Sequence, residues 1–351
     1  MTQTLYMAFI FSLGLGTTLT FVSNHWLYAW MGVEISTMAM IPLMADNYHP
    51  RSTEAMIKYF IIQSVSATML IFATVINSAI DPQWGVHQIT HPLAAVIILL
   101  ALGMKVGLAP CHMWLPEILQ GLKLSSGSNL STWQKLAPFA LMLQMAHIAP
   151  HNSLFAAGVL STLMAGWAGM NQTQIRKILA YSSTAHLGWT IIVLHFIPNL
   201  SALVLGVYIF STLTAFLTLM ETSSTKISDL SQALKKSLVV MVVFSLTLLS
   251  LAGLPPLSGF LPKWLVLEEM IKQEETMLAS LIAISALLSL FFYIRLCFFT
   301  IMTLFPSTTK IPLHWRNMFK KQNTTMAVVA TSSVILLPFA PLISAVMLFY
   351  P

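Results

Sequence analysis

Several ionisable side chains lie in the middle of apolar segments, where they could take up and release protons. Lys105 is embedded in ALGMKVGLAPCHMWLP (101–116), Lys135 in STWQKLAPF and Glu34 in HWLYAWMGVEISTMAMIPL. A charged group at bilayer depth costs about 2.5–3.5 kcal/mol on insertion scales, and such residues usually mark ion or proton pathways. A carboxylate that moves toward or away from a buried lysine changes how firmly the lysine holds its proton. We therefore expect Glu34 and Lys105 to load and release a proton together.

A histidine adds a further candidate. His186 follows Tyr181, Ser182 and Ser183 in the apolar segment ILAYSSTAHLGW. Hydroxyl groups and an imidazole can form a hydrogen-bonded wire that passes protons. A buried histidine whose ring is simply satisfied by a neighbouring hydroxyl is an equally good interpretation.

Lys263 follows the second of two proline-rich stretches, in GLPPLSGFLPKW (253–264). It could belong to the proton path, or it could lie at the membrane surface facing Glu268 and Glu269. One buried ionisable group then falls in each of five apolar segments, which is typical of a lateral proton relay through a helix bundle. The predicted relay residues are Glu34, Lys105, Lys135, His186 and Lys263.

Prolines interrupt the segment that contains Lys105. Pro110 and Pro116 flank His112, and a proline removes a backbone N–H and crowds the carbonyl four residues earlier. Freed carbonyls inside a membrane need water or a polar neighbour. We therefore expect a hydrated, protein-lined path here, with His112 acting as a relay group or as a cap for the freed carbonyls.

The same pattern occurs again later in the chain. GLAP (107–110) followed by LP (115–116) matches GLPP (253–256) followed by LP (261–262), which supplies Pro256 and Pro262. Proline- and glycine-interrupted segments at corresponding positions of two halves indicate the transport path of a transporter built from repeats.

Composition places the chain in a membrane. Of 351 residues, 57% are hydrophobic and 8% are charged, whereas about 25% of a soluble domain is charged. The net charge of +6 comes from basic residues in short loops, which indicates membrane topology rather than binding of nucleic acid. The two cysteines are too few to hold an iron–sulfur cluster, and the histidine spacings match no metal motif.

The predicted fold is an all-α polytopic membrane protein, a single transmembrane domain over 1–351. Two segments, 92–120 and 237–267, are too long for one straight crossing of a bilayer core of about 30 Å, so each should contain a broken helix. These two segments are five crossings apart and run in opposite senses, which predicts an inverted repeat with halves of about 25–150 and 153–304. The eleven predicted spans are 3–21, 25–45, 56–79, 92–120, 125–147, 153–171, 176–197, 201–221, 237–267, 276–304 and, as a C-terminal helix, 325–349.

Loop charges predict the orientation. Most lysines and arginines fall in the loops after the even-numbered spans, and the loops on the other side hold Lys272 among glutamates. Basic loops stay in the cytoplasm or the matrix. The N-terminus is therefore expected on that side and the C-terminus on the opposite side.

Four motifs together resemble those of the antiporter-like membrane subunits of respiratory complex I. They are KVGLAPCHMWLP, WQKLAP, LAYSSTAHLG and GLPPLSGFLPKW, and the resemblance covers essentially the whole chain. It implies proton pumping driven by electron transfer from NADH to ubiquinone elsewhere in the complex. The family's glutamate–lysine pair matches Glu34 and Lys105, its central lysine matches Lys135, and its outer ionisable residue matches Lys263.

The resemblance also implies a location and partners. It implies the mitochondrial inner membrane, with the N-terminus on the matrix side and the C-terminus in the intermembrane space. FMN, iron–sulfur clusters, NADH and ubiquinone would bind to other subunits, with no cofactor and no metal held by this chain. Partners would be other membrane subunits, including neighbouring antiporter-like ones, and lipids, with no nucleic acid.

Two other interpretations remain. A free-standing Na⁺/H⁺ or K⁺/H⁺ antiporter would have a similar bundle, although hard cations prefer oxygen ligands and lysines dominate here. A structural scaffold, with Glu34 as a mere helix–helix contact, would carry inert buried charges. Four such groups without partners would cost roughly 10 kcal/mol, which favours a proton-carrying role.

Overall fold

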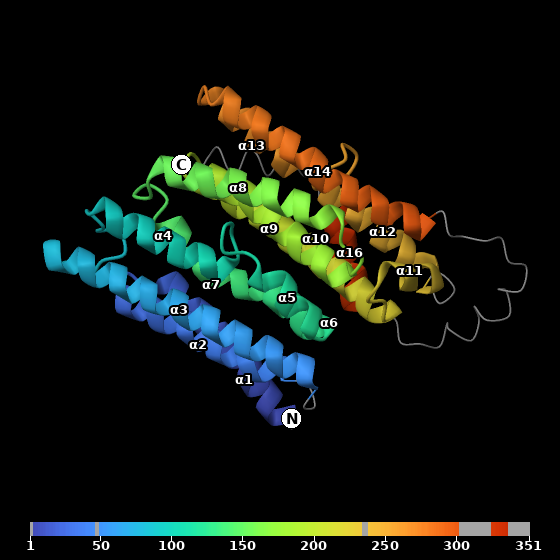
Figure 1. The fold of residues 1–351 in the computed structure, drawn as a ribbon, viewed down its shortest axis with the longest axis horizontal. Coiled ribbons are helices and arrows are strands. Elements are labelled where there is room, and N and C mark those ends of the chain that lie inside the picture. The colour runs from blue at the N-terminus through green and yellow to red at the C-terminus, as the bar shows by residue number, and fades with distance from the viewer. Residues whose placement is uncertain (1–2, 46–48, 234–237, 302–323, 336–351) are drawn as a thin grey trace, which may run out of the picture.

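The structure is a computed structural model that describes residues 3–45, 49–233, 238–301 and 324–335. Over these residues the chain forms helices and short connections, with isolated β-bridges rather than strands. The helices lie side by side in one bundle (Figure 1). Helices α1, α2 and α3 form one flank, α4 to α7 lie beside them, and α8 to α14 form the opposite side.

Among the described residues, six helices are long and apolar enough to cross a membrane. This agrees with the predicted all-α polytopic fold, while the number of eleven crossings stays a prediction. Helix α9 (Ile175–Leu194) is also long. The short helix α11 (Ile227–Ala233) was not predicted, and α16 (Thr324–Ile335) covers the first part of the predicted C-terminal helix. Positions 336–349 of the predicted last span lie outside the described residues. The six long helices are α1 (Gln3–Val22), α2 (Trp26–Met44), α3 (Pro50–Ile80), α8 (His151–Met170), α10 (Pro198–Thr222) and α14 (Thr276–Ile301).

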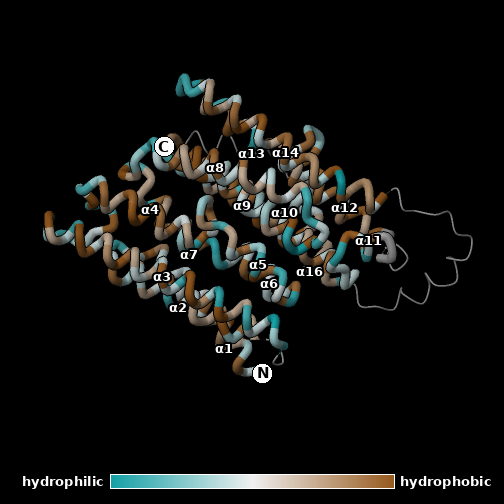
Figure 2. Tube along the Cα trace, viewed as in Figure 1, coloured by the Kyte–Doolittle hydropathy of each residue, from teal (hydrophilic) through white to brown (hydrophobic). Residues whose placement is uncertain are grey.

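The outer faces of the bundle carry large apolar side chains. Phe11, Phe72, Trp167 and Leu287 are between 61% and 70% exposed. Hydrophobic residues run along most helices rather than along one stripe (Figure 2). A lipid environment explains this pattern, because apolar side chains gain nothing there by turning inward.

Both predicted helix breaks are present. The first separates α4 (Pro92–Val106) from α5 (Trp114–Gly121), and the second separates α12 (Leu238–Ala252) from α13 (Phe260–Lys272). Each upstream helix ends at a glycine with positive φ, +91° at Gly107 and +83° at Gly253. Residues with a side chain rarely adopt this conformation. A Cβ atom at Gly107 would also lie 2.9 Å from Leu115 Cδ1.

The prolines act differently from the prediction. Pro116 and Pro262 are the third residues of α5 and α13. The first turn of a helix has no internal partner for its N–H groups, so a proline there costs no hydrogen bond. The carbonyl of His112 accepts a hydrogen bond from the Leu115 amide at 3.1 Å. These prolines therefore start the second helix of each pair, and the glycines end the first.

A third break was not predicted. The segment expected as one span over 125–147 divides into α6 (Leu124–Ser131), a 3₁₀ turn η1 (Trp133–Lys135) and α7 (Leu136–Gln144). The Thr132 hydroxyl donates to the Ser128 carbonyl at 2.7 Å, and such side-chain bonds compete with the helix. Pro138 cannot donate an N–H to the carbonyl four residues earlier. The break places Lys135 at a turn inside the bundle.

Candidate functional site

The Glu34 carboxylate and the Lys105 ammonium form an ion pair between α2 and α4. Lys105 Nζ lies 3.2 Å from Glu34 Oε1, and their side chains are 1% and 19% exposed. The Gln63 side chain donates to the Lys105 carbonyl at 3.4 Å. The pair that the sequence suggested on type and position alone is therefore a direct contact, 71 positions apart in the chain.

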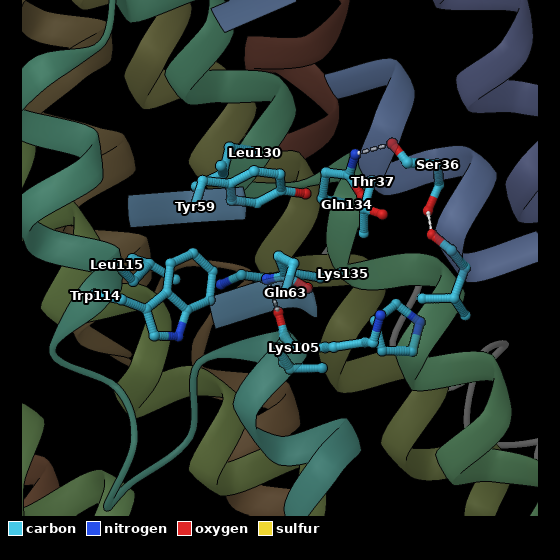
Figure 3. Close-up of a pocket in the computed structure, with 13 residues that line it drawn as sticks. Ser36, Thr37, Tyr59, Gln63, Lys105, Trp114, Leu115, Leu130, Gln134 and Lys135 are labelled. Carbon is cyan, nitrogen blue, oxygen red and sulfur yellow. Dashed lines mark hydrogen bonds between the residues drawn. The ribbon is translucent and has the colours of Figure 1, made fainter. Parts of the chain in front are cut away.

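A polar cavity separates Lys105 from Lys135. Both lysines line it, together with Ser36, Gln63 and Gln134 (Figure 3). It leaves about 10 Å³ for the centre of a water molecule, which is roughly the room that one water needs. Gln134 Nε2 donates to the Ser36 carbonyl at 2.7 Å across the cavity wall. Sequence reasoning missed the two glutamines, although amide side chains inside apolar segments are a usable signal.

Lys135 contacts a tyrosine from the second half of the chain. Its Nζ atom donates to the Tyr208 hydroxyl at 3.0 Å and lies 4.9 Å from the centre of the ring. The Tyr208 hydroxyl in turn donates to the Ser131 carbonyl at 3.0 Å. Both side chains are buried, at 2% exposure each. Tyr208 was also missed, and its position inside the apolar helix α10 was the only signal.

His186 lies between two tyrosines. Its Nε2 atom is 3.4 Å from the Tyr293 hydroxyl, and its ring centre is 5.4 Å from that of Tyr208. The predicted wire through Tyr181, Ser182 and Ser183 to His186 stays a prediction. Ser182 and Ser183 donate to the carbonyls of Leu179 and Ala180 within their own helix, at 2.8 and 2.7 Å.

Lys263 binds the end of the broken helix that precedes it. Its Nζ atom donates to the carbonyls of Ala252 at 2.8 Å and Leu251 at 3.3 Å. It lines a second cavity, again with about 10 Å³ for a water centre, together with His186 and Tyr208. The alternative that Lys263 faces the loop glutamates is wrong, because those carboxylates lie 3.0 and 2.8 Å from Lys272.

His112 lies apart from these residues, in the first helix break. Its ring is 1% exposed and packs against Tyr181, with ring centres 6.3 Å apart. Neither ring nitrogen has a hydrogen-bond partner among the described residues. The expectation that His112 acts as a relay group or as a cap for freed carbonyls stays a prediction. Pro110 and Pro256 lie in the turns of the two breaks.

The site residues together form a line through the bundle. The order is Glu34, Lys105, the first cavity, Lys135, Tyr208, the second cavity with His186, and Lys263. Carboxylates, amines, phenols and imidazoles can each accept and donate a proton. In the part of the chain that the structure describes, no group of three or more His, Cys, Asp or Glu side chains is arranged to hold a metal ion.

Family models match nearly the whole chain. The model described as "NADH:quinone oxidoreductase/Mrp antiporter, TM" matches residues 23–289, and the one described as "NADH dehydrogenase subunit 2 C-terminus" matches residues 290–344. The fold is that of an antiporter-like membrane protein, and the chain belongs to the family of NADH-ubiquinone oxidoreductase chain 2.

Curated relatives support this assignment. The NADH-ubiquinone oxidoreductase chain 2 of Formosania lacustris is 51% identical over 97% of both chains, and that of Salmo salar is 50% identical over 96% of both. The protein of the same name from Scyliorhinus canicula is 48% identical over 99% of this chain and 100% of its own length.

Solved structures show the same fold. A chain of respiratory complex I from Thermus thermophilus matches with a TM-score of 0.86 and 24% identity, covering 99% of this chain and 80% of that one. A chain of the Mrp complex from Dietzia sp. matches with a TM-score of 0.72 and 15% identity, covering 83% of this chain and 59% of that one.

Proposed function

We propose that this chain is a membrane subunit of NADH–ubiquinone oxidoreductase that carries protons across the mitochondrial inner membrane through Glu34, Lys105, Lys135, His186 and Lys263. The observation that carries the proposal is the line of contacts and water-sized cavities that joins these residues. Family membership supports the same function, because relatives that are 51% and 50% identical over nearly the full chain are named as chain 2 of that enzyme.

The proton is loaded at the ion pair of Glu34 and Lys105. In the closed pair, the Glu34 carboxylate stabilises the charged form of Lys105 at 3.2 Å. When Glu34 moves away, the buried ammonium loses its compensating charge, and a buried charge without a partner is costly. Lys105 then releases its proton into the cavity that it shares with Lys135. The second cavity takes the proton onward to His186 and Lys263.

Redox chemistry belongs to other subunits in this proposal. A cluster held by thiolates alone needs four cysteines, and the two of this chain, Cys111 and Cys297, are far apart in the sequence. NADH, FMN, the clusters and ubiquinone would bind elsewhere in the complex. The partners of this chain are neighbouring antiporter-like subunits and lipids, with the N-terminus in the matrix and the C-terminus in the intermembrane space.

The two corresponding helix breaks support a transport role. The glycines that end α4 and α12 share a positive φ, and the motifs that begin at them, GLAP (107–110) and GLPP (253–256), are similar. Broken helices in two corresponding halves are typical of transport paths. A free-standing cation/proton antiporter is the second candidate, and it is less well supported because the relatives are oxidoreductase chains.

The decisive experiment measures protons pumped per NADH oxidised in sealed membranes that contain the assembled complex. We expect Lys105→Met to lower this ratio while the complex remains intact. Lys272→Met is the matched control, because this lysine is 54% exposed and pairs only with nearby glutamates among the described residues. A normal ratio in Lys105→Met would overturn the proposal and favour the scaffold interpretation. Purification of the chain apart from any large complex would favour the antiporter.

A further inference from the structure

The two water-sized cavities are joined by one hydrogen bond between side chains. Lys135 lines the first cavity and Tyr208 lines the second, and the residues that line one are entirely different from those that line the other. The bond from Lys135 Nζ to the Tyr208 hydroxyl, at 3.0 Å, crosses from one to the other. We propose, resting on the proton-carrying function above, that the Tyr208 hydroxyl is the gate between the two halves of the proton path.

The hydrogen bonds of Tyr208 define a closed gate. Its oxygen accepts a hydrogen bond from Lys135, and its own proton is donated to the Ser131 carbonyl at 3.0 Å. A phenol has one proton to donate. That proton therefore points toward the α6 break and not into the second cavity. The gate opens when the hydroxyl releases Ser131 and turns its proton toward the cavity that it shares with His186.

The unpredicted helix break between α6 and α7 supplies the hydrogen-bond acceptor that holds the gate closed. In a continuous helix the Ser131 carbonyl would accept the amide of Lys135, four residues later. Here the Lys135 amide donates to the Thr132 carbonyl at 3.3 Å instead. The Ser131 carbonyl is thereby left for Tyr208. The same three-residue turn thus positions the lysine and the acceptor that restrains the tyrosine.

The transfer through the open gate balances in protons and charge. One N–H bond of the Lys135 ammonium breaks and an O–H bond forms on Tyr208, while the original O–H bond of Tyr208 breaks. That proton passes, directly or through one water, to the His186 imidazole. Lys135 becomes a neutral amine, His186 becomes an imidazolium and Tyr208 remains a neutral phenol. The step transfers no electrons.

The first test removes only the hydroxyl. In the intact complex in sealed membranes, we expect Tyr208→Phe to lower the number of protons pumped per NADH to the level of Lys135→Met. The double variant should fall no further, because both changes interrupt one path. Thr214→Val is the matched control. Thr214 lies on the same helix, is buried, and donates only to the Ser211 carbonyl among described residues, at 2.7 Å, so the ratio should stay normal.

The second test distinguishes a gate from a structural support. Tyr208→Ser removes the ring and leaves space in which water can join the two cavities. We expect passive proton flux under an imposed pH gradient, without NADH, to rise in Tyr208→Ser and to stay at the wild-type level in Tyr208→Phe. A tyrosine that only supports the fold would reduce assembly in both variants and raise the flux in neither.

The outcomes separate the gate from the function on which it rests. A reduced ratio in Lys135→Met together with a normal ratio in assembled Tyr208→Phe would overturn the gate and leave the proton path intact. Normal ratios in both would overturn the proton path itself. A reduced ratio in Tyr208→Phe with unchanged flux in assembled Tyr208→Ser would also overturn the gate, because the Tyr208 side chain would then not be what separates the cavities.

Discussion

The Lys263 ammonium donates to the Ala252 carbonyl at 2.8 Å, so one lysine both binds the last carbonyl of the α12 helix and lines the second cavity. A backbone carbonyl exposed to lipid has no water that could donate a hydrogen bond to it, and a carbonyl without a donor costs several kcal/mol. Lys263 therefore stabilises the break that allows it to reach the cavity. Its structural role and its proposed proton-carrying role can be separated by substitution.

For Lys263 we expect two substitutions to differ. Arginine keeps a donor for the carbonyls but cannot give up its proton, so Lys263→Arg should assemble and pump fewer protons per NADH. Methionine leaves the carbonyls unpaired, at about 1–3 kcal/mol each, so Lys263→Met should also yield less assembled complex. Native electrophoresis and the pumped-proton ratio measure the two effects. Equal pumping in Lys263→Arg and wild type would show that Lys263 has only the structural role.

For the ion pair of Glu34 and Lys105 we expect a second substitution to restore the assembly that the first one impairs. Glu34→Gln leaves the Lys105 ammonium, 1% exposed, without its partner, and breaking a buried pair costs about 3–5 kcal/mol. Assembly should therefore fall. Adding Lys105→Met removes the stranded charge, so assembly should recover in the double variant while pumping stays low. A double variant that assembles worse than both single variants would mean that the two residues are not coupled.

For the glycines that end α4 and α12, alanine should destabilise the complex. Gly107→Ala and Gly253→Ala force an L residue into positive φ, which costs about 1 kcal/mol or more. The Cβ atom at Gly253 would also lie 2.8 Å from Lys263 Cδ, so that variant should lose pumping as well. Gly206→Ala is the control, because nothing lies within 4 Å of its Cβ position. The thermal dissociation temperature of the complex measures the stability effect, and equal temperatures for all three variants would contradict this account.

For His112 we expect an apolar ring to be tolerated. Two ring nitrogens that lack hydrogen-bond partners among the described residues contribute desolvation cost, about 1–3 kcal/mol for each unpaired group. His112→Phe should therefore keep or raise the dissociation temperature and keep normal pumping. Loss of pumping in the assembled variant would return His112 to the relay.

Sequence reasoning identified the buried charges and, from the prolines, the place of both helix breaks, because each has a local signature. A lysine in an apolar run and a repeated GLxP motif can be recognised without knowledge of their neighbours. Tyr208 could not be found this way, since its role follows from a contact with Lys135, 73 positions away. The break before Lys135 was missed because its cause, hydroxyl competition at Thr132 together with Pro138, is weaker than a glycine at positive φ.

Lys105 and Lys263 share a position that links charge to backbone order. Lys105 lies in the last turn of α4, and the Lys263 ammonium lies at the last carbonyls of α12. The C-terminal end of a helix carries a partial negative charge that a cation stabilises. A lysine that gives up its proton thus withdraws support from the end of a helix. On the proposed path, each proton that passes Lys105 or Lys263 would therefore briefly loosen the end of α4 or α12, which couples backbone order to proton transfer.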